Sequence, residues 1–168
     1  TVYVTHDQKE ALTMSDRIAV INDGELKQLG SPNEIYTSPK NAFIADFIGE
    51  SSLLPTKVIN NKAYIGQSEI LVNKKVNSDG DCLLVIRPEK LFITNGKEKN
   101  SNIFTGIIEE SIFQGESQLV VIKLDPENFG EQLLRMRLPN GTSIGNKPPV
   151  VGEEISVGLR MTDSFLVE

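Results

Sequence analysis

The chain has 168 residues, of which 39% are hydrophobic and 24% are charged, and it carries a net charge of −6. This acidic balance argues against nucleic acid as a partner, because a phosphate backbone is bound through a basic surface. The single cysteine, Cys82, excludes an intrachain disulfide, and the longest apolar runs fall far short of the roughly 18 residues that cross a bilayer. These properties predict an ordinary globular protein.

The first residues predict a strand followed by a helix. Val2-Tyr3-Val4 is apolar and predicts a buried strand, and Asp7 to Ser15 predicts a helix. Asp7 can cap this helix while the carboxylate of Glu10, at the third helical position, reaches back in a capping box. His6 then lies at the strand-to-helix corner, where open α/β folds place their ligand chemistry. A lone histidine here also fits a capping or packing role.

The next segment predicts a hairpin and two short helices. The strands are Arg17 to Ile21 and Glu25 to Leu29, joined at Asp23-Gly24, a dipeptide that tolerates the positive φ angles of a two-residue turn. Ser31-Pro32-Asn33-Glu34 starts a helix, because a hydroxyl cap, a proline and a glutamate follow in the favoured order. The last helix is Asn41 to Ile48, with Gly49 as its terminator. Its apolar stripe, which we interpret as simple packing, is Phe43, Ile44, Phe47 and Ile48.

The pattern changes around Gly49 to Pro55, and from there short strands alternate with turns. This spacing predicts a small barrel or sandwich over residues 51–168, distinct from a helix-rich part over residues 1–50. Leu119 to Ile122, which leads to Asp125 and Glu127, imitates a metal-binding strand, but we interpret it as a strand and a turn. The predicted strands are 56–59, 62–65, 69–72, 82–87, 91–94, 103–113, 117–124, 132–138, 154–159 and 164–167.

Residues 1–50 resemble a known family. The matching segments, in unbroken register, are Tyr3 to Leu12, Ser15 to Val20, Asp23-Gly24, Gly30-Ser31-Pro32, Glu34-Ile35-Tyr36 and Phe43 to Glu50. This succession resembles the carboxy-terminal end of the nucleotide-binding domain of ATP-binding-cassette importers. The resemblance implies that residues 1–50 are an α/β remnant of a P-loop ATPase domain, and that His6 is the switch histidine that contacts the γ-phosphate of ATP. The chain does not begin with Met, and we expect it to be the tail of a larger protein.

Other parts of that ATPase site are absent from the sequence. There is no Gly-x-x-x-x-Gly-Lys-Ser/Thr loop to hold phosphates and no Leu-Ser-Gly-Gly-Gln-type segment. The resemblance implies that the intact subunit, which would include these missing parts, binds ATP and Mg²⁺ and hydrolyses ATP. We expect the present chain by itself to be inactive, with no complete cofactor site and no metal site.

The second part resembles the TOBE domain, an oligosaccharide-binding-like β module that follows the ATPase domain in some of these importers. Val85 to Glu89 is its most recognisable piece, followed by Gly106-Ile107-Ile108 and Gly152 to Ile155. The resemblance implies a mainly β fold, with a small OB-like barrel or sandwich that serves regulation or dimerisation. Arg87 and Glu89 flank a proline, and they either brace the loop as an ion pair or contact a ligand or another subunit.

The sequences of the segments Glu10 to Arg17 and Ala45 to Leu54 look most like those of the spermidine/putrescine subgroup of these importers. This implies polyamine transport by a homodimeric subunit that is bound to membrane permease subunits on the cytoplasmic face of the bacterial membrane, without nucleic acid. Two alternatives stay open. One is the ATPase subunit of a sugar, ferric iron, sulfate or molybdate importer. The other is a stand-alone TOBE module for small-ligand binding or dimerisation.

Overall fold

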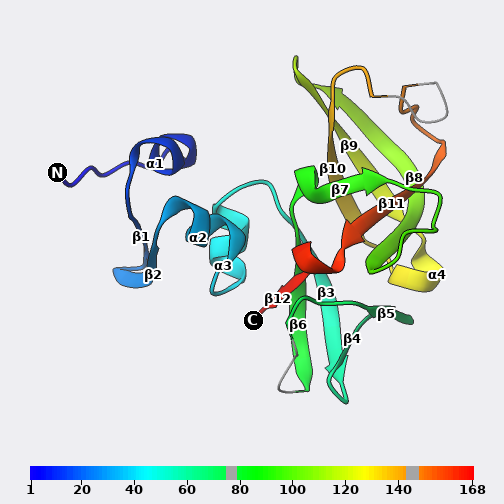
Figure 1. The fold of residues 1–168 in the computed structure, drawn as a ribbon, viewed down its shortest axis with the longest axis horizontal. Coiled ribbons are helices and arrows are strands. Elements are labelled where there is room, and N and C mark those ends of the chain that lie inside the picture. Colours follow the sequence, from blue (N-terminus) through cyan, green and yellow to red (C-terminus); the bar gives the residue numbers. More distant parts are fainter. Residues whose placement is uncertain (75–78, 143–147) are drawn as a thin grey trace. The chain divides into compact units, whose positions relative to one another are not determined.

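The computed structural model describes residues 1–74, 79–142 and 148–168. The chain divides into two compact units (Figure 1). The first comprises Thr1–Glu50 with Val167–Glu168, and the second comprises Ser51–Leu166. Among the described residues, no helix combines the length and the hydropathy that a membrane span requires.

The first unit consists of short helices around a two-stranded ribbon. Its elements are α1 (Gln8–Met14), β1 (Ile18–Asn22), β2 (Glu25–Gly30), α2 (Pro32–Thr37) and α3 (Ala42–Phe47). Each helix begins where the sequence offers a side-chain cap, because such a cap satisfies backbone N–H groups that lack a partner within the helix. Asp7 caps α1, Ser31 caps α2 in a complete capping box with Glu34, and Asn41 caps α3. Gly49, with a φ of 100°, follows the end of α3.

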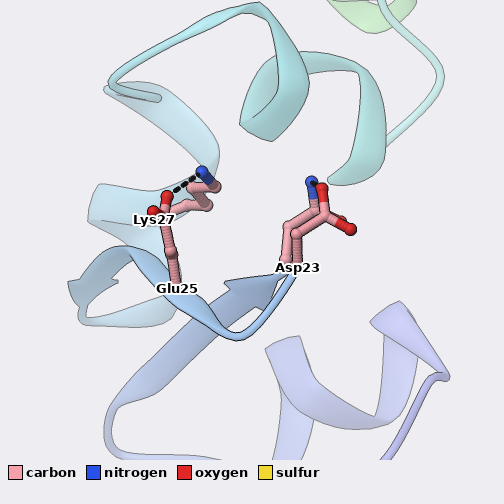
Figure 2. Close-up of polar contacts among 4 residues, drawn as sticks. Asp23, Glu25 and Lys27 are labelled. Carbon is pink, nitrogen blue, oxygen red and sulfur yellow. Dashed lines mark hydrogen bonds and ion pairs between the residues drawn. The ribbon is translucent and has the colours of Figure 1, made fainter.

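The β1–β2 ribbon turns at Asp23-Gly24, as predicted. Both residues have positive φ angles, 53° and 76°, and Asn22 pairs with Glu25 across the two-residue loop. Figure 2 shows the Lys27 side chain directed toward that of Glu25, and Lys27 Nζ lies 2.6 Å from Glu25 Oε2. Asn22 Nδ2 donates to Asp23 Oδ2. The contact with Lys27 lowers the pKa of Glu25, first through its hydrogen bond and then through its charge. The turn is therefore fixed by local chemistry alone.

Two features of the first unit contradict the sequence predictions. Val2-Tyr3-Val4 forms no strand, and its side chains are largely exposed. The apolar stripe of α3 packs into the core only in part: Ile44 and Ile48 are buried, as predicted. Phe43 and Phe47 are instead 36% and 40% exposed and stack on each other, with ring centroids 5.5 Å apart. The core is aliphatic instead, consisting of Ile18, Val20, Ile35, Ile44 and Ile48.

The described residues of the second unit form two five-stranded sheets. One sheet has the order β12-β6-β3-β4-β5 and the other has the order β10-β9-β8-β11-β7. The strands of the first are β3 (Ser52–Ile59), β4 (Lys62–Ile65), β5 (Ser68–Ile70), β6 (Gly80–Ile86) and β12 (Phe165–Val167). Those of the second are β7 (Leu91–Ile93), β8 (Ser101–Phe113), β9 (Ser117–Leu124), β10 (Leu133–Pro139) and β11 (Glu154–Arg160).

One hydrophobic cluster joins the two sheets, since it takes side chains from both, with Leu54 and Leu84 on one side and Phe104 and Ile122 on the other. The long strand β8 carries a register shift between Ile108 and Glu110, and such irregularities bend and twist a sheet. A mainly β, OB-like barrel or sandwich is thus confirmed. The described part of this unit also contains the short helical turns η1 (Pro88–Lys90), α4 (Pro126–Phe129) and η2 (Met161–Asp163).

The turn predicted after β9 is the short helix α4, whose helical form was not predicted. Asp125 caps it through the backbone N–H of Glu127, and Phe129 is buried against Phe104 with ring centroids 5.3 Å apart. Asn128 O accepts a hydrogen bond from Gln67 N–H, which holds α4 against the β4–β5 turn. The acidic residues after β9 therefore begin a helical turn, and the described residues contain no group of His, Cys, Asp and Glu side chains arranged to hold a metal ion.

Candidate functional site

His6 lies immediately before α1, on a short segment that hydrogen bonds hold on both sides. Its side chain is exposed and makes no hydrogen bond or ion pair with any described residue. Asp7 N–H donates to Thr5 Oγ1 at 3.0 Å, and Asp7 Oδ1 accepts from Lys9 N–H and Glu10 N–H. The imidazole is thus accessible to a group outside the described residues, while hydrogen bonds fix the backbone on both sides of it.

Glu10 does not complete the predicted capping box. Its Oε2 atom instead accepts hydrogen bonds from Thr5 Oγ1 at 2.9 Å and from Tyr3 Oη at 3.2 Å. The expectation was wrong because the hydroxyl of Thr5 already accepts the Asp7 N–H that Glu10 was predicted to reach. The negative charge of Glu10, and then the hydrogen bond to its carboxylate, raise the pKa of Tyr3 above its ordinary value.

A further contact ties the start of α1 to the end of α3. Gly49 N–H donates to Gln8 Oε1 at 3.1 Å, across 41 positions of sequence. Helix α1 buries none of its residues fully, so this bond adds an anchor that packing alone does not supply. The corner that carries His6 is therefore positioned mainly by polar contacts.

Arg87 and Glu89 lie at the end of β6 and in η1. Arg87 is 3% exposed and its Nη1 donates to Ser51 Oγ at 2.6 Å, whereas Glu89 is exposed. The burial of Arg87 favours a bracing role within the second unit. A ligand or subunit contact by this pair stays a prediction.

The second unit has an open cleft of about 550 Å³ beside β7, β11 and η2. Its walls combine an aromatic ring with cations: the Arg160 guanidinium lies 5.6 Å from the ring centroid of Phe92, and Lys99 lines the same cleft. The remaining polar lining consists of the carboxylate residue Glu98, the amide residue Asn100 and two hydroxyl residues, Ser101 and Thr162. Sequence reasoning missed this cleft because its residues come from segments about 60 positions apart.

Asn102 is a second feature that the sequence did not reveal. It is 5% exposed; its Oδ1 accepts from Leu71 N–H at 2.7 Å, and its Nδ2 donates to Leu71 O at 2.8 Å and to Ser164 Oγ at 2.9 Å. Ser164 Oγ in turn donates to Arg160 O. This amide joins the end of β5, the start of β8 and the segment around η2. The η2 residues form one edge of the cleft.

Comparison with known proteins places the second unit in a family. The TOBE domain matches residues 84–167, which is half of the chain. The chain belongs to the TOBE domain family. The matched region begins within β6 and ends with β12, so it contains Arg87, Glu89, Asn102 and the whole cleft.

Relatives extend the likeness to residues outside the TOBE domain. The chain is 34% identical over 179 aligned positions to the spermidine/putrescine import ATP-binding protein PotA of Thermotoga maritima, covering 99% of this chain and 48% of that protein. It is 36% identical to the protein of the same name from Clostridium novyi, covering 96% of this chain and 46% of that protein. The PotA protein of Pseudomonas aeruginosa is also 36% identical, with coverage of 99% and 47%.

The resemblance to the carboxy-terminal part of importer ATP-binding proteins is thereby confirmed, and the chain spans about half the length of the curated relatives that it matches. A solved structure is similar in fold: the cytoplasmic molybdate-binding protein ModG, with molybdate bound, matches 70% of this chain and 93% of its own, with a TM-score of 0.51 and 12% identity. This likeness supports the fold of the TOBE domain alone.

Proposed function

We propose that the chain works as the carboxy-terminal part of the ATP-binding subunit of a bacterial polyamine importer. The observation that carries the proposal is similarity along 96–99% of the chain to spermidine/putrescine import ATP-binding proteins. The intact subunit would use ATP with Mg²⁺ and act as a homodimer. It would lie peripherally on the cytoplasmic face of the membrane, through permease subunits.

His6 would contact the γ-phosphate of the substrate ATP in that subunit. Three features support this role: the imidazole is exposed, it makes no hydrogen bond or ion pair within the described residues, and both of its neighbours are held by hydrogen bonds. An imidazole N–H can donate to the charge on a transferring phosphoryl group. Because the sequence contains no Gly-x-x-x-x-Gly-Lys-Ser/Thr loop, we expect the isolated chain to hydrolyse ATP no faster than buffer.

The test uses the intact subunit that carries this sequence, reconstituted with its permease. We expect His6→Ala to lower ATP hydrolysis by about 100-fold or more, since a positioned proton donor or acceptor contributes about that much. Lys9→Ala is the matched control, because the Lys9 side chain is exposed and makes no hydrogen bond or ion pair with the described residues. Equal hydrolysis by the His6 variant and the control would contradict the role of His6.

Uptake measurements test the transported substrate separately. Labelled spermidine and putrescine should be taken up in an ATP-dependent manner, whereas maltose, ferric iron, sulfate and molybdate should not. Uptake of any of these others in place of polyamine would assign the subunit to that importer class instead.

The TOBE domain would serve regulation or dimerisation. The cleft beside β7 and β11 supports this part of the proposal, because it offers cations, hydroxyls and an aromatic face to a small molecule. Sedimentation of the chain with and without spermidine, molybdate or maltose tests it. A strict monomer that responds to none of the three would contradict it.

A further inference from the structure

The carboxylate of Glu10 is the common acceptor for the segment that precedes His6. Tyr3 Oη and Thr5 Oγ1 both donate to its Oε2 atom, at 3.2 and 2.9 Å. Thr5 Oγ1 also accepts the Asp7 N–H at 3.0 Å, so a chain of hydrogen bonds runs from α1 through Glu10 and Thr5 to the backbone directly after His6. The segment that precedes His6 thus shares one acceptor, the Glu10 side chain, through Tyr3 and Thr5.

Within the described residues, 1–5 form no strand, and Val2 and Val4 are 92% and 90% exposed. The contacts that the structure gives this segment are therefore the hydrogen bonds to Glu10. Helix α1 has seven residues and buries none of them fully. Hydrogen bonds to an ionised acceptor are about twice as strong as neutral ones, which makes a carboxylate suited to this task.

We propose that Glu10 is the positioning residue for His6, acting through Thr5 and Tyr3 to fix the backbone from which the imidazole projects. The inference rests on the proposed function only for what His6 contacts, since the positioning itself is a property of this chain. The raised pKa of Tyr3 supports the same geometry, because the charge of Glu10 is its largest cause. Removal of Glu10 should loosen the corner without changing the aliphatic core of the first unit.

The experiment is nuclear magnetic resonance on the full 168-residue chain, in which His6 is the single histidine and its imidazole signals need no separation from others. In the unaltered protein we expect the His6 backbone to show an order parameter near 0.85, typical of rigid structure. Glu10→Ala should lower it below about 0.6. Glu10→Gln, which keeps an oxygen acceptor, should retain most of the order while returning the pKa of Tyr3 toward its ordinary value.

Two variants of Thr5 test the hydrogen bonds from Glu10 through Thr5 to Asp7 without changing a residue of α1. Thr5→Val preserves the shape and removes the hydroxyl, so it should loosen His6 as Glu10→Ala does. Thr5→Ser keeps the hydroxyl and should restore the order. Asp16→Ala is the control for loss of a carboxylate, because Asp16 is exposed and makes no hydrogen bond or ion pair with the described residues.

The methyl signals of Ile35 and Ile44, both fully buried, report whether the first unit stays folded. Unchanged His6 order in both Glu10→Ala and Thr5→Val, with these signals intact, would overturn the proposal. If Glu10→Ala disturbs the methyl signals, the Thr5→Val and Thr5→Ser pair decides the result. A His6→Ala subunit with full ATP hydrolysis would refute the proposed function of His6 and leave the assignment of Glu10 standing.

Discussion

The hydrogen bonds that join Asn102 to Leu71 and Ser164 form a polar clamp in the TOBE domain, and replacement of Asn102 by alanine tests it. The substitution removes the two hydrogen bonds with Leu71 and the one with Ser164, at 2.7, 2.8 and 2.9 Å. Each such bond contributes about 0.5–1.5 kcal/mol net, so the three together give about 1.5–4.5 kcal/mol. Leu71 is 39% exposed, and water can therefore reach part of its freed backbone, which places the expected loss near 2–3 kcal/mol.

The assay is urea unfolding followed by circular dichroism, since the chain has no tryptophan. With an m-value of about 1.5 kcal/mol/M, the midpoint for the second unit should fall by about 1.5 M. Asn95→Ala is the control, because Asn95 is exposed and its side chain makes no hydrogen bond with the described residues. A midpoint for Asn102→Ala within the scatter of the Asn95 variant would refute the clamp.

Three further predictions concern single positions. Gly106→Ala should destabilise the second unit by about 1–3 kcal/mol in the same urea assay, because a Cβ atom there would overlap the Lys123 carbonyl oxygen of the neighbouring strand; an unchanged midpoint would contradict this contact. Gly158→Ala would drive a Cβ atom into the Phe92 ring, so its cost and that of Phe92→Ala should be less than additive in a double-mutant cycle, and strict additivity would argue against the contact. The pKa of Glu34 is lowered because the Ser31 N–H and hydroxyl donate to its carboxylate. The stability that this pair contributes is therefore fully present above the unfolded-state pKa of about 4.3, and it is lost as the pH falls through the folded-state pKa of Glu34. Glu34→Gln should therefore lower the melting temperature of the first unit at pH 7 but not near pH 2, and an equal loss at both pH values would refute this linkage.

Local sequence signals predicted most of the elements. Strand β9 has the predicted bounds, 117–124, because it is a short apolar, partly β-branched run with turns at both ends. The capping box at Ser31 and Glu34 formed as expected, since both partners belong to one turn of chain. A prediction failed where a side chain had more than one possible partner. Glu10 lies three residues after its helix cap, as Glu34 does, yet its carboxylate accepts hydrogen bonds from the hydroxyls of Thr5 and Tyr3.

The candidate site was predictable only in part. The sequence singled out His6 by its position before a helix, and in the structure it precedes Asp7, the cap of α1, although no strand comes before it. It could not foresee that Phe43 and Phe47 would be exposed, because their helical spacing with Ile44 and Ile48 fits two adjacent faces and only the neighbouring elements select which face is buried. The predicted strand at Val2 to Val4 likewise failed for want of a pairing partner, which strands require and helices do not.

The sequence by itself determined the caps, the turns, the alternating strands and the family resemblance, because each depends on residues within a few positions of one another. The tertiary structure decided what distant residues do together. Asn102 meets Leu71 and Ser164 across 31 and 62 positions, and Arg160 meets the Phe92 ring across the β7–β11 pair. Such contacts arise from sheet order and register, which a linear pattern does not encode, and they form the clamp and the cleft of the TOBE domain.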